Sequence, residues 1–393
     1  NRLTQLSPRS VAMELAGFRS PVIFSREQYI RNPLYPGRVR RQWRGTAAGL
    51  KNPIDGLSKE LNSIGMQHLD DAVARRRVRS AFVDVHRNLD HPLFKMISTE
   101  KIKTEEWYER NSRGIEIFCK SWKPKRGIRV KGAVGISHGY GDTCTFFFEG
   151  IAQRIAASGY CVYALDHPCF GLSEGLHGYI HHFNELSDNI IEIYSKIKGD
   201  NSELKGLPFY LLGQSMGGAV ALKSHLKQPD AWDGMILVAP MCKIAESVMP
   251  PEPILKIMTF LSKVLPKAKI FPQKDMTELV LRDPQKRKIA EYNVICYNDQ
   301  MRVRTAVELI EATKEIESQV ENVSSPLLII HGGADRVTDP LVSKFLYERA
   351  SSSDKTIKLY EDGYHCILEG EPDDTIFAVL DDIIAWLDLR SSL

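Results

Sequence analysis

The stretch LLGQSMGGAVAL at residues 211–222 decides the fold of this chain, because it joins a strand-like apolar run to a helix-like run through the pattern G-x-S-x-G. This is the pattern of a nucleophile elbow, a tight strand-to-helix turn that carries a serine. Gly213 and Gly217 lack the side chains that would crowd such a turn. The following helix begins with unpaired N–H groups and the positive end of its dipole, which favour negative charge near the Ser215 hydroxyl. The stretch therefore predicts an oxyanion site.

The alternative is a glycine-rich turn with no catalytic role, since so short a pattern also recurs by chance in long chains. Here, however, the pattern lies between a strand and a helix, as the chemistry requires. We therefore interpret Ser215 as a candidate nucleophile.

The composition is that of an ordinary globular protein, with 393 residues, 43% hydrophobic and 26% charged. This length allows one large domain or two, and a doubly wound α/β domain with insertions would use most of it. The net charge of +3 is uneven, because residues 1–50 hold nine Arg, no Lys and two Glu, which is 9 − 2 = +7. The remaining residues carry 3 − 7 = −4. A mildly acidic fold does not indicate nucleic-acid binding.

Seven cysteines are scattered without C-x-x-C spacing. This favours a reducing compartment and argues against a disulfide framework or a zinc site. No apolar run approaches the ~20 residues of a membrane span, so only a peripheral membrane contact is left open.

Residues 1–55 are rich in Arg, Ser and Thr, poor in acid and punctuated by proline. This composition predicts an organelle transit peptide, which points to a plastid location. The alternative is a disordered basic tail on a cytoplasmic or membrane-peripheral protein.

Residues 57–93 have helical periodicity and predict a surface helix pair that packs on the main domain. We expect residues 56–110 to form a helical N-terminal extension and residues 111–393 to form the main domain. The basic cluster at residues 75–77 is assigned to a solvated face.

From Gly114 onward, strand-like and helix-like segments alternate. The expected strands are residues 115–118, 132–137, 160–165, 208–212, 235–239, 326–330 and 356–360. Helices between successive strands, such as residues 183–197, imply parallel pairing through right-handed crossovers. The pattern predicts an α/β fold in which a mostly parallel central sheet has helices on both faces.

The alternation stops over residues 240–313, which contain several prolines and an apolar run. The apolar residues are Ile254, Leu255, Ile257, Met258, Phe260 and Leu261. Such an insertion is the natural place for a helical lid over the catalytic edge, with its apolar side toward substrate or membrane. The alternative is that these residues are core.

Three candidate catalytic residues, Ser215, Asp335 and His365, each follow a predicted strand, so parallel strands bring them to one edge of the sheet. Their order is that of α/β-hydrolases. His365 can take the serine proton, while Asp335 fixes the imidazole tautomer and stabilises the imidazolium. Of the rival residues, Asp339 is expected to cap a helix, and His138 to hydrogen-bond within its own loop.

The oxyanion hole is expected to use the backbone N–H groups of Met216 and of Tyr140, which lies in HGYG at residues 138–141. No metal is expected at His177, His181 and His182, because Cys and carboxylates at ligand spacing are missing. The H-x4-D pattern from His225 to Asp230 lies at the far end of the helix after Ser215 and is expected to face away from the site.

Five motifs together carry a family resemblance: HGYGD at 138–142, GLSEG at 171–175, GQSMGG at 213–218, HGGADRVTDP at 331–340 and YH at 364–365. They resemble the monoglyceride lipase branch of the serine hydrolases over about residues 105–390, and the plant lysophospholipases and caffeoylshikimate esterases look closest. The resemblance implies the α/β-hydrolase fold, a lid at the insertion, and ester cleavage without a prosthetic group. One departure is Cys169, where the family usually has Gly, and a positive φ there would add strain.

The first functional hypothesis is a serine ester hydrolase that cleaves monoacylglycerols or lysophospholipids through an acyl-enzyme. The alternative within enzymes is an esterase for phenolic esters such as caffeoylshikimate. Outside enzymes the alternative is a ligand-binding protein of the same fold, against which the complete Ser, Asp and His set argues.

Overall fold

The computed structural model describes residues 50, 52–95, 101–125, 127–245, 249–271 and 275–391. All of them belong to one compact unit, Thr46–Leu393. The predicted transit segment therefore lies outside the described residues except for its last few positions, and it stays a prediction.

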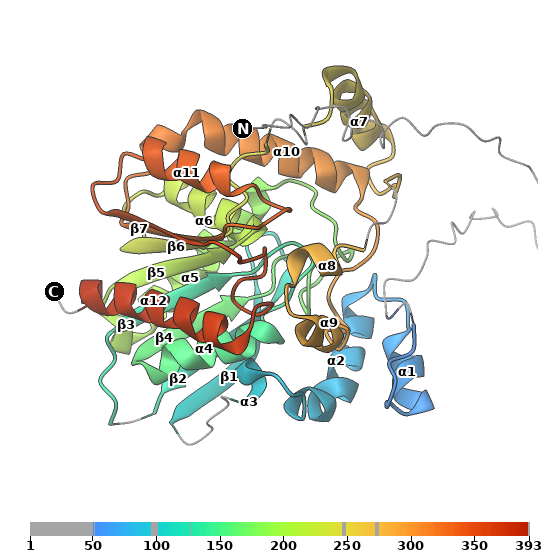
Figure 1. Ribbon diagram of the computed structural model, residues 1–393, viewed down its shortest axis with the longest axis horizontal. Helices are drawn as coiled ribbons and strands as arrows, with labels where there is room; N and C mark the ends of the chain where they lie inside the picture. The colour runs from blue at the N-terminus through green and yellow to red at the C-terminus, as the bar shows by residue number, and fades with distance from the viewer. Residues whose placement is uncertain are drawn as a thin grey trace, which may run out of the picture. The chain divides into compact units, whose positions relative to one another are not determined.

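An eight-stranded sheet with the order β1-β2-β4-β3-β5-β6-β7-β8 forms the centre (Figure 1). The strands are β1 Ile102–Arg110, β2 Glu116–Pro124, β3 Gly132–Ser137, β4 Tyr160–Leu165, β5 Phe209–Gln214, β6 Gly234–Val238, β7 Leu327–Gly332 and β8 Lys355–Tyr360. β2 is antiparallel to both of its neighbours, and all other pairs are parallel. The predicted, mostly parallel sheet is confirmed.

Helices cover both faces of the sheet (Figure 1). Alternate residues of the strands divide between two cores, as the two-residue period of a strand requires, so that Val134 of β3 faces one core and Ala133 the other. The first core includes α4 Phe147–Ala157 and α12 Asp373–Ser391. The second includes α5 Asn184–Asp200, α6 Met216–Lys227, α10 Val303–Ser318 and α11 Pro340–Arg349, while η1 Ser202–Leu204 and η3 Val320–Asn322 are short 3₁₀ turns. This is the predicted α/β-hydrolase architecture.

The N-terminal extension holds the predicted helix pair, α1 Lys59–Gly65 and α2 Ala72–Arg87, followed by the short α3 Pro92–Lys95. The prediction that the extension stays helical to residue 110 is wrong, because β1 occupies Ile102–Arg110. β1 is the edge strand next to β2, and Ile102 is its only fully buried residue. An edge strand with so little buried surface has no apolar alternation from which to predict it.

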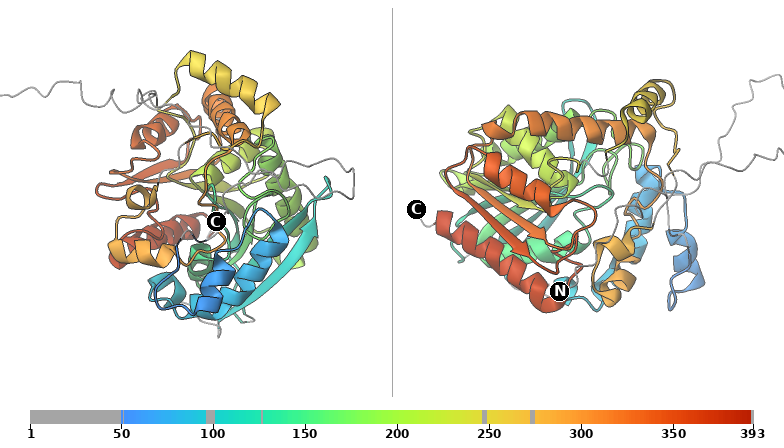
Figure 2. Two further views of the ribbon diagram at one scale, coloured as in Figure 1. Left: turned by 90° about the vertical axis from the view of Figure 1, so that its right-hand side faces the viewer. Right: turned by 45° about the horizontal axis from the view of Figure 1, so that its top comes forward.

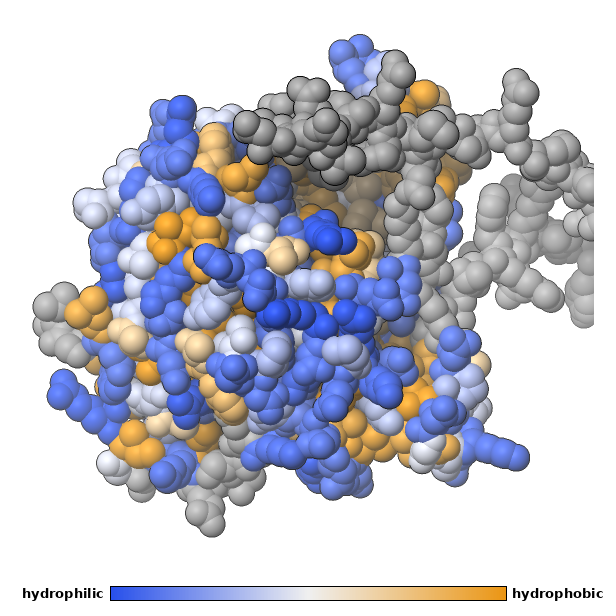
Figure 3. Space-filling model, viewed as in Figure 1, coloured by the Kyte–Doolittle hydropathy of each residue, from blue (hydrophilic) through white to orange (hydrophobic). Residues whose placement is uncertain are grey.

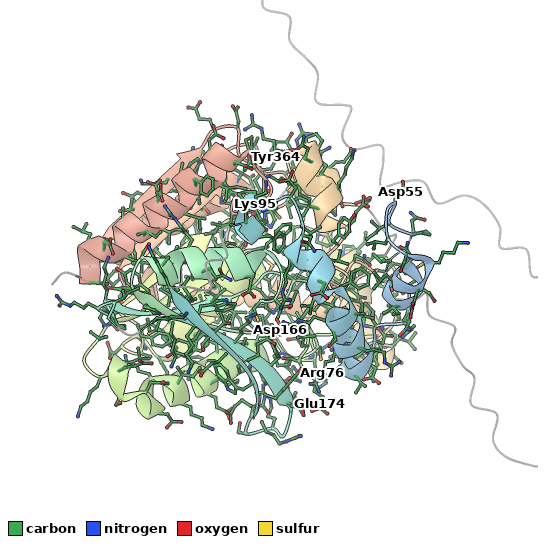
Figure 4. The ribbon with its side chains drawn as sticks, turned by 90° about the horizontal axis from the view of Figure 1, so that it is seen from below. Asp55, Arg76, Lys95, Asp166, Glu174 and Tyr364 are labelled. Carbon is green, nitrogen blue, oxygen red and sulfur yellow. The ribbon has the colours of Figure 1, made fainter. Side chains whose placement is uncertain are left out.

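The prediction that the basic cluster at residues 75–77 lies on a solvated face is wrong for Arg75, because its side chain is completely buried. The guanidinium donates to the backbone oxygens of Gly171 (2.5 Å), Ser173 (2.7 Å) and Gly175 (3.3 Å), and to those of Leu69 and Asp70. Arg76 Nε donates to the Leu172 carbonyl of the same loop (2.9 Å), and Figure 4 labels Arg76 on α2 and Glu174 on that loop. Five N–H donors in a rigid fork explain how one arginine can satisfy so many carbonyls inside the protein. α2 is therefore pinned to the loop that follows β4.

The insertion over residues 240–313 contains α7 Glu252–Val264, α8 Thr277–Val280, α9 Pro284–Ala290 and the start of α10. α7 packs on α10 through Met258, against Val307 and Ile310, and stands outermost in both views of Figure 2. Ile254, Ile257 and Phe260 are 50%, 59% and 65% exposed. The alternative that the apolar run is core is therefore wrong for this face of α7.

No helix in the described part of the chain is long and apolar enough to cross a membrane.

Candidate active site

Ser215 lies on a sharp turn between the end of β5 and the start of α6, with φ 54° and ψ −119°. A positive φ is uncommon for a residue with a side chain and persists only where neighbours hold it. The Ser215 N–H donates to the Val238 carbonyl (2.9 Å), and the Ser215 carbonyl accepts from the Met241 N–H (3.0 Å). β6 and the residues after it thus fix the turn.

Gly213 and Gly217 leave no space for side chains. A Cβ on Gly213 would lie 2.4 Å from the Gly217 carbonyl oxygen, and one on Gly217 would lie 1.9 Å from the oxygen of Ser137. Both distances are far below van der Waals contact. Glycine at 213 therefore lets the end of β5 lie against the start of α6, and glycine at 217 lets α6 lie against the end of β3.

The structure brings Ser215, Asp335 and His365 together at the carboxyl edge of the sheet. Asp335 follows β7 and His365 follows β8. The Ser215 Oγ donates to His365 Nε2 over 2.9 Å, and His365 Nδ1 donates to Asp335 Oδ2 over 2.7 Å. The aspartate and histidine are buried, whereas Ser215 is partly accessible. This is the hydrogen-bond relay of a serine nucleophile, its base and an orienting acid.

Both oxygens of Asp335 accept further hydrogen bonds. Oδ2 accepts from His331 Nε2 (3.0 Å) and Thr338 Oγ1 (2.9 Å), and Oδ1 accepts from the N–H groups of Val337 (2.7 Å) and Thr338 (3.1 Å). Burial alone would raise the pKa of Asp335, but hydrogen bonds from His331, His365 and the Val337 N–H hold this pKa below its usual range. The carboxylate is therefore charged at any pH at which the protein would work.

The rival residues have other roles. Asp339 caps α11 by accepting from the Leu341 N–H (2.8 Å). His138 accepts the His167 N–H at Nε2 (3.0 Å), and His225 accepts the Ser324 N–H (3.1 Å). Within the described residues, no three His, Cys, Asp or Glu side chains are placed to hold a metal ion.

The two N–H groups expected to form the oxyanion hole flank Ser215. Met216 is the first residue of α6, and Gly139, just before Tyr140, lies so close that its Cβ would be 3.5 Å from Ser215 Cβ. Neither the Met216 N–H nor the Tyr140 N–H donates a hydrogen bond within the described part of the chain. Two free donors beside a serine hydroxyl can bind the oxygen of a tetrahedral intermediate.

The insertion supports the loop that carries Tyr140. The Tyr297 N–H donates to the Gly141 carbonyl (2.7 Å), and the Asn293 amide donates to Asp142 Oδ1 (3.1 Å). The rings of Tyr297 and Tyr140 meet edge to face at 5.9 Å. The later half of the insertion is therefore a fixed wall of the site, which the sequence did not indicate.

Cys169 has φ 71°, the positive value for which glycine is the usual residue. Gly175 leaves room for its thiol, because a Cβ at position 175 would lie 2.4 Å from the Cys169 Sγ. The departure from the family pattern thus adds local backbone strain, and Arg75 pins the loop that contains it.

Three supporting residues were not assigned a role from the sequence: His331, Thr338 and Arg75. His331 and Thr338 stand in the quoted motif around Asp335, so the motif itself was an available signal. Arg75 carried no signal, because a buried arginine and a solvated one look alike in sequence.

A family model described as serine aminopeptidase, S33, matches residues 128–373, which is more than half of the chain and includes all three catalytic candidates. The chain belongs to this family. The family match and the ester hydrolases among its relatives show that this serine hydrolase is a carboxylic ester hydrolase.

The curated relatives match more than two thirds of the chain. The chain is 34% identical to caffeoylshikimate esterase of Arabidopsis thaliana over 295 residues, covering 72% of this chain and 88% of the relative. It is 29% identical to monoglyceride lipase of Rattus norvegicus over 287 residues, covering 71% and 89%. A solved structure of a soluble variant of monoglyceride lipase from Saccharomyces cerevisiae, in complex with a substrate analog, superimposes with a TM-score of 0.65 at 21% identity, covering 77% of this chain and 99% of that one. The solved structure supports the fold, and the two relatives support the reaction class.

Proposed function

We propose that this serine hydrolase cleaves monoacylglycerols or lysophospholipids through an acyl-enzyme intermediate. In this mechanism the Ser215 Oγ attacks the ester carbonyl while His365 Nε2 takes its proton. The N–H groups of Tyr140 and Met216 stabilise the oxyanion, and the imidazolium then protonates the leaving alcohol. Water, activated by His365, releases the acyl group. No prosthetic group takes part.

The observation that best supports a lipid substrate is the exposed apolar face of α7. Ile254, Ile257, Phe260 and Val264 lie on a helix of the insertion and remain at least half exposed. Figure 3 shows a hollow with an apolar surface between α10 and α8 of the same insertion. Each methylene group removed from water contributes about 0.8 kcal/mol, so a long acyl chain gains much from such surfaces. We propose that α7 is the lid and that it rests on lipid surfaces.

Caffeoylshikimate is the second candidate substrate, because the 34% identical relative bears that name. A caffeoyl ring needs hydrogen-bond partners for its hydroxyls. The hydroxyl of Tyr297 already donates to the Gln300 carbonyl (2.6 Å) and that of Tyr140 to the Gly178 carbonyl (3.2 Å). The aromatic pair beside the oxyanion loop therefore offers ring surface and hydroxyl oxygens that can only accept, a poorer match to a caffeoyl ring than free hydroxyls, and this favours the lipid.

Assays on a series of monoacylglycerols, on a lysophosphatidylcholine and on caffeoylshikimate test the substrate. We expect kcat/KM to rise from short to long acyl chains and caffeoylshikimate to be cleaved poorly. Replacing Ile257 and Phe260 together by serine is expected to lower kcat/KM for the long chains and leave the short chains unaffected. Lys256→Ser, an exposed change on the same helix, is the matched control. Faster cleavage of caffeoylshikimate than of every lipid would overturn the lipid proposal and leave the serine mechanism standing.

We further propose that residues 1–55 direct import into plastids, on the strength of nine Arg and no Lys among the first fifty residues. Deletion of residues 1–49 removes none of the catalytic candidates, so we expect the shortened enzyme to retain its esterase activity. A fluorescent fusion of the full chain is expected in plastids of plant cells and the shortened fusion in the cytosol. A cytosolic full-chain fusion would contradict the proposal.

A further inference from the structure

One side-chain contact joins the loop of the proposed nucleophile to the loop of the proposed base. Gln214 directly precedes Ser215, and Glu369 lies four residues after His365. The Gln214 Nε2 donates to Glu369 Oε1 over 2.9 Å and approaches Oε2 at 3.3 Å. Both residues are only 4% exposed. We propose that Gln214 and Glu369 are a positioning pair that sets Ser215 against His365; this inference rests on the catalytic roles proposed above.

Glu369 is itself fixed, so it can act as an anchor. Its N–H donates to the Cys366 carbonyl (3.2 Å), and its own carbonyl accepts from His91 Nε2 (3.0 Å). His91 Nδ1 accepts the Leu93 N–H (3.1 Å), which leaves the ring hydrogen on Nε2 for the bond to Glu369. Glu369 is thus tied to its own loop on one side and to the N-terminal extension on the other.

The carboxyl group of Glu369 pairs best with the amide of Gln214 when the carboxyl group is protonated. No Lys or Arg forms an ion pair with Glu369 among the described residues. Burial and, after it, the nearby Asp142 carboxylate raise the pKa of Glu369 to about 7, against the opposing effects of Gln214, Cys366 and His365. Gln214 Oε1 is buried and finds no hydrogen-bond donor in the described part of the chain. A neutral carboxyl group offers both a donor and an acceptor, as the amide does.

The contact matters because the Ser215 turn is strained and catalysis depends on its position. Ser215 has φ 54°, and its Oγ lies 2.9 Å from His365 Nε2. A misplacement of about 1 Å can lower turnover by about 10²-fold. Loss of the pair is therefore expected to affect kcat, since no group that would bind substrate changes.

Steady-state kinetics on a short nitrophenyl ester tests the pair without reference to the natural substrate. Gln214→Met and Glu369→Met are each expected to lower kcat by about 10-fold to 100-fold and to leave KM nearly unchanged. The double replacement is expected to be no worse than either single one, because all three remove the same contact. Asp362→Asn, an exposed change in the His365 loop, is the control. If Ser215 of the unmodified enzyme did not react with a fluorophosphonate, that result would instead contradict the proposed function.

Glu369→Gln separates positioning from a general effect on folding, because an amide at this position can still pair with Gln214 but cannot ionise. We expect this variant to keep most of kcat and to lose an ionisation near pH 7 from the pH profile of kcat. Full kcat in the single Met variants, or effects that multiply in the double variant, would overturn the pairing. An unchanged pH profile in Glu369→Gln would overturn the role of the neutral acid.

Discussion

Replacement of Ser215 by alanine is expected to lower kcat by about 10⁶-fold, as removal of the serine does in other enzymes of this mechanism. Without the Oγ there is no atom to form the acyl-enzyme and no proton for His365 to take. The free N–H groups of Tyr140 and Met216 and the binding surfaces remain, so ~10³-fold to 10⁴-fold acceleration over water should persist. Kinetics on a short ester and labelling with a fluorophosphonate measure both effects.

The fold should survive this change, because the turn is held by backbone hydrogen bonds to Val238 and Met241 and not by the serine side chain. Equal melting temperatures for Ser215→Ala and the unmodified enzyme would verify that the fold is intact. Ser224→Ala is the matched control on the same helix, since the Ser224 Oγ bonds, among the described residues, only to the carbonyls of Val220 and Ser187. Activity or labelling that persisted in Ser215→Ala would refute the assignment of the nucleophile.

Most of the central sheet was predictable because its inner strands, β3 to β7, are buried along their whole length. β3 and β4 have the predicted bounds, and the other parallel strands differ from prediction by one or two residues at their ends. A continuous apolar run between turn residues is a strong signal for such strands. The catalytic candidates were predictable for a related reason, since each follows one of the parallel strands that the sequence predicts.

Features that depend on tertiary contacts were not predictable. β1 pairs along its whole length with β2 but buries almost nothing, so its hydrogen bonds leave no trace in its sequence. Arg75 lies in a run of three arginines, of which Arg77 is exposed and Arg75 is completely buried. What distinguishes them is a set of backbone carbonyls almost a hundred residues away, on the loop after β4. The wall formed by Tyr297 and Asn293 depends in the same way on contacts between distant segments.

Asp335→Asn is expected to lower kcat by about 10⁴-fold, because the asparagine changes the tautomer of His365. An asparagine has one oxygen and one NH₂ group, and both positions of the Asp335 carboxylate are faced by donors. Asp335 Oδ1 accepts two backbone N–H groups, from Val337 and Thr338, which cannot become acceptors. The amide oxygen must therefore take the Oδ1 position, and the NH₂ group then faces His365 Nδ1.

His365 Nδ1 must accept from that NH₂ group, so the ring hydrogen moves to Nε2 and points at the Ser215 Oγ, where the imidazole can no longer take the serine proton. Asp339→Asn is the matched control, because asparagine caps a helix as well as aspartate and would keep the bond from the Leu341 N–H. We expect it to change kcat by less than about 2-fold, since Asp339 touches no catalytic group. The kcat values of the two variants on one ester, with their melting temperatures, decide between the acids. A larger loss in Asp339→Asn than in Asp335→Asn would transfer the orienting role to Asp339, against the 2.7 Å contact between Asp335 and His365.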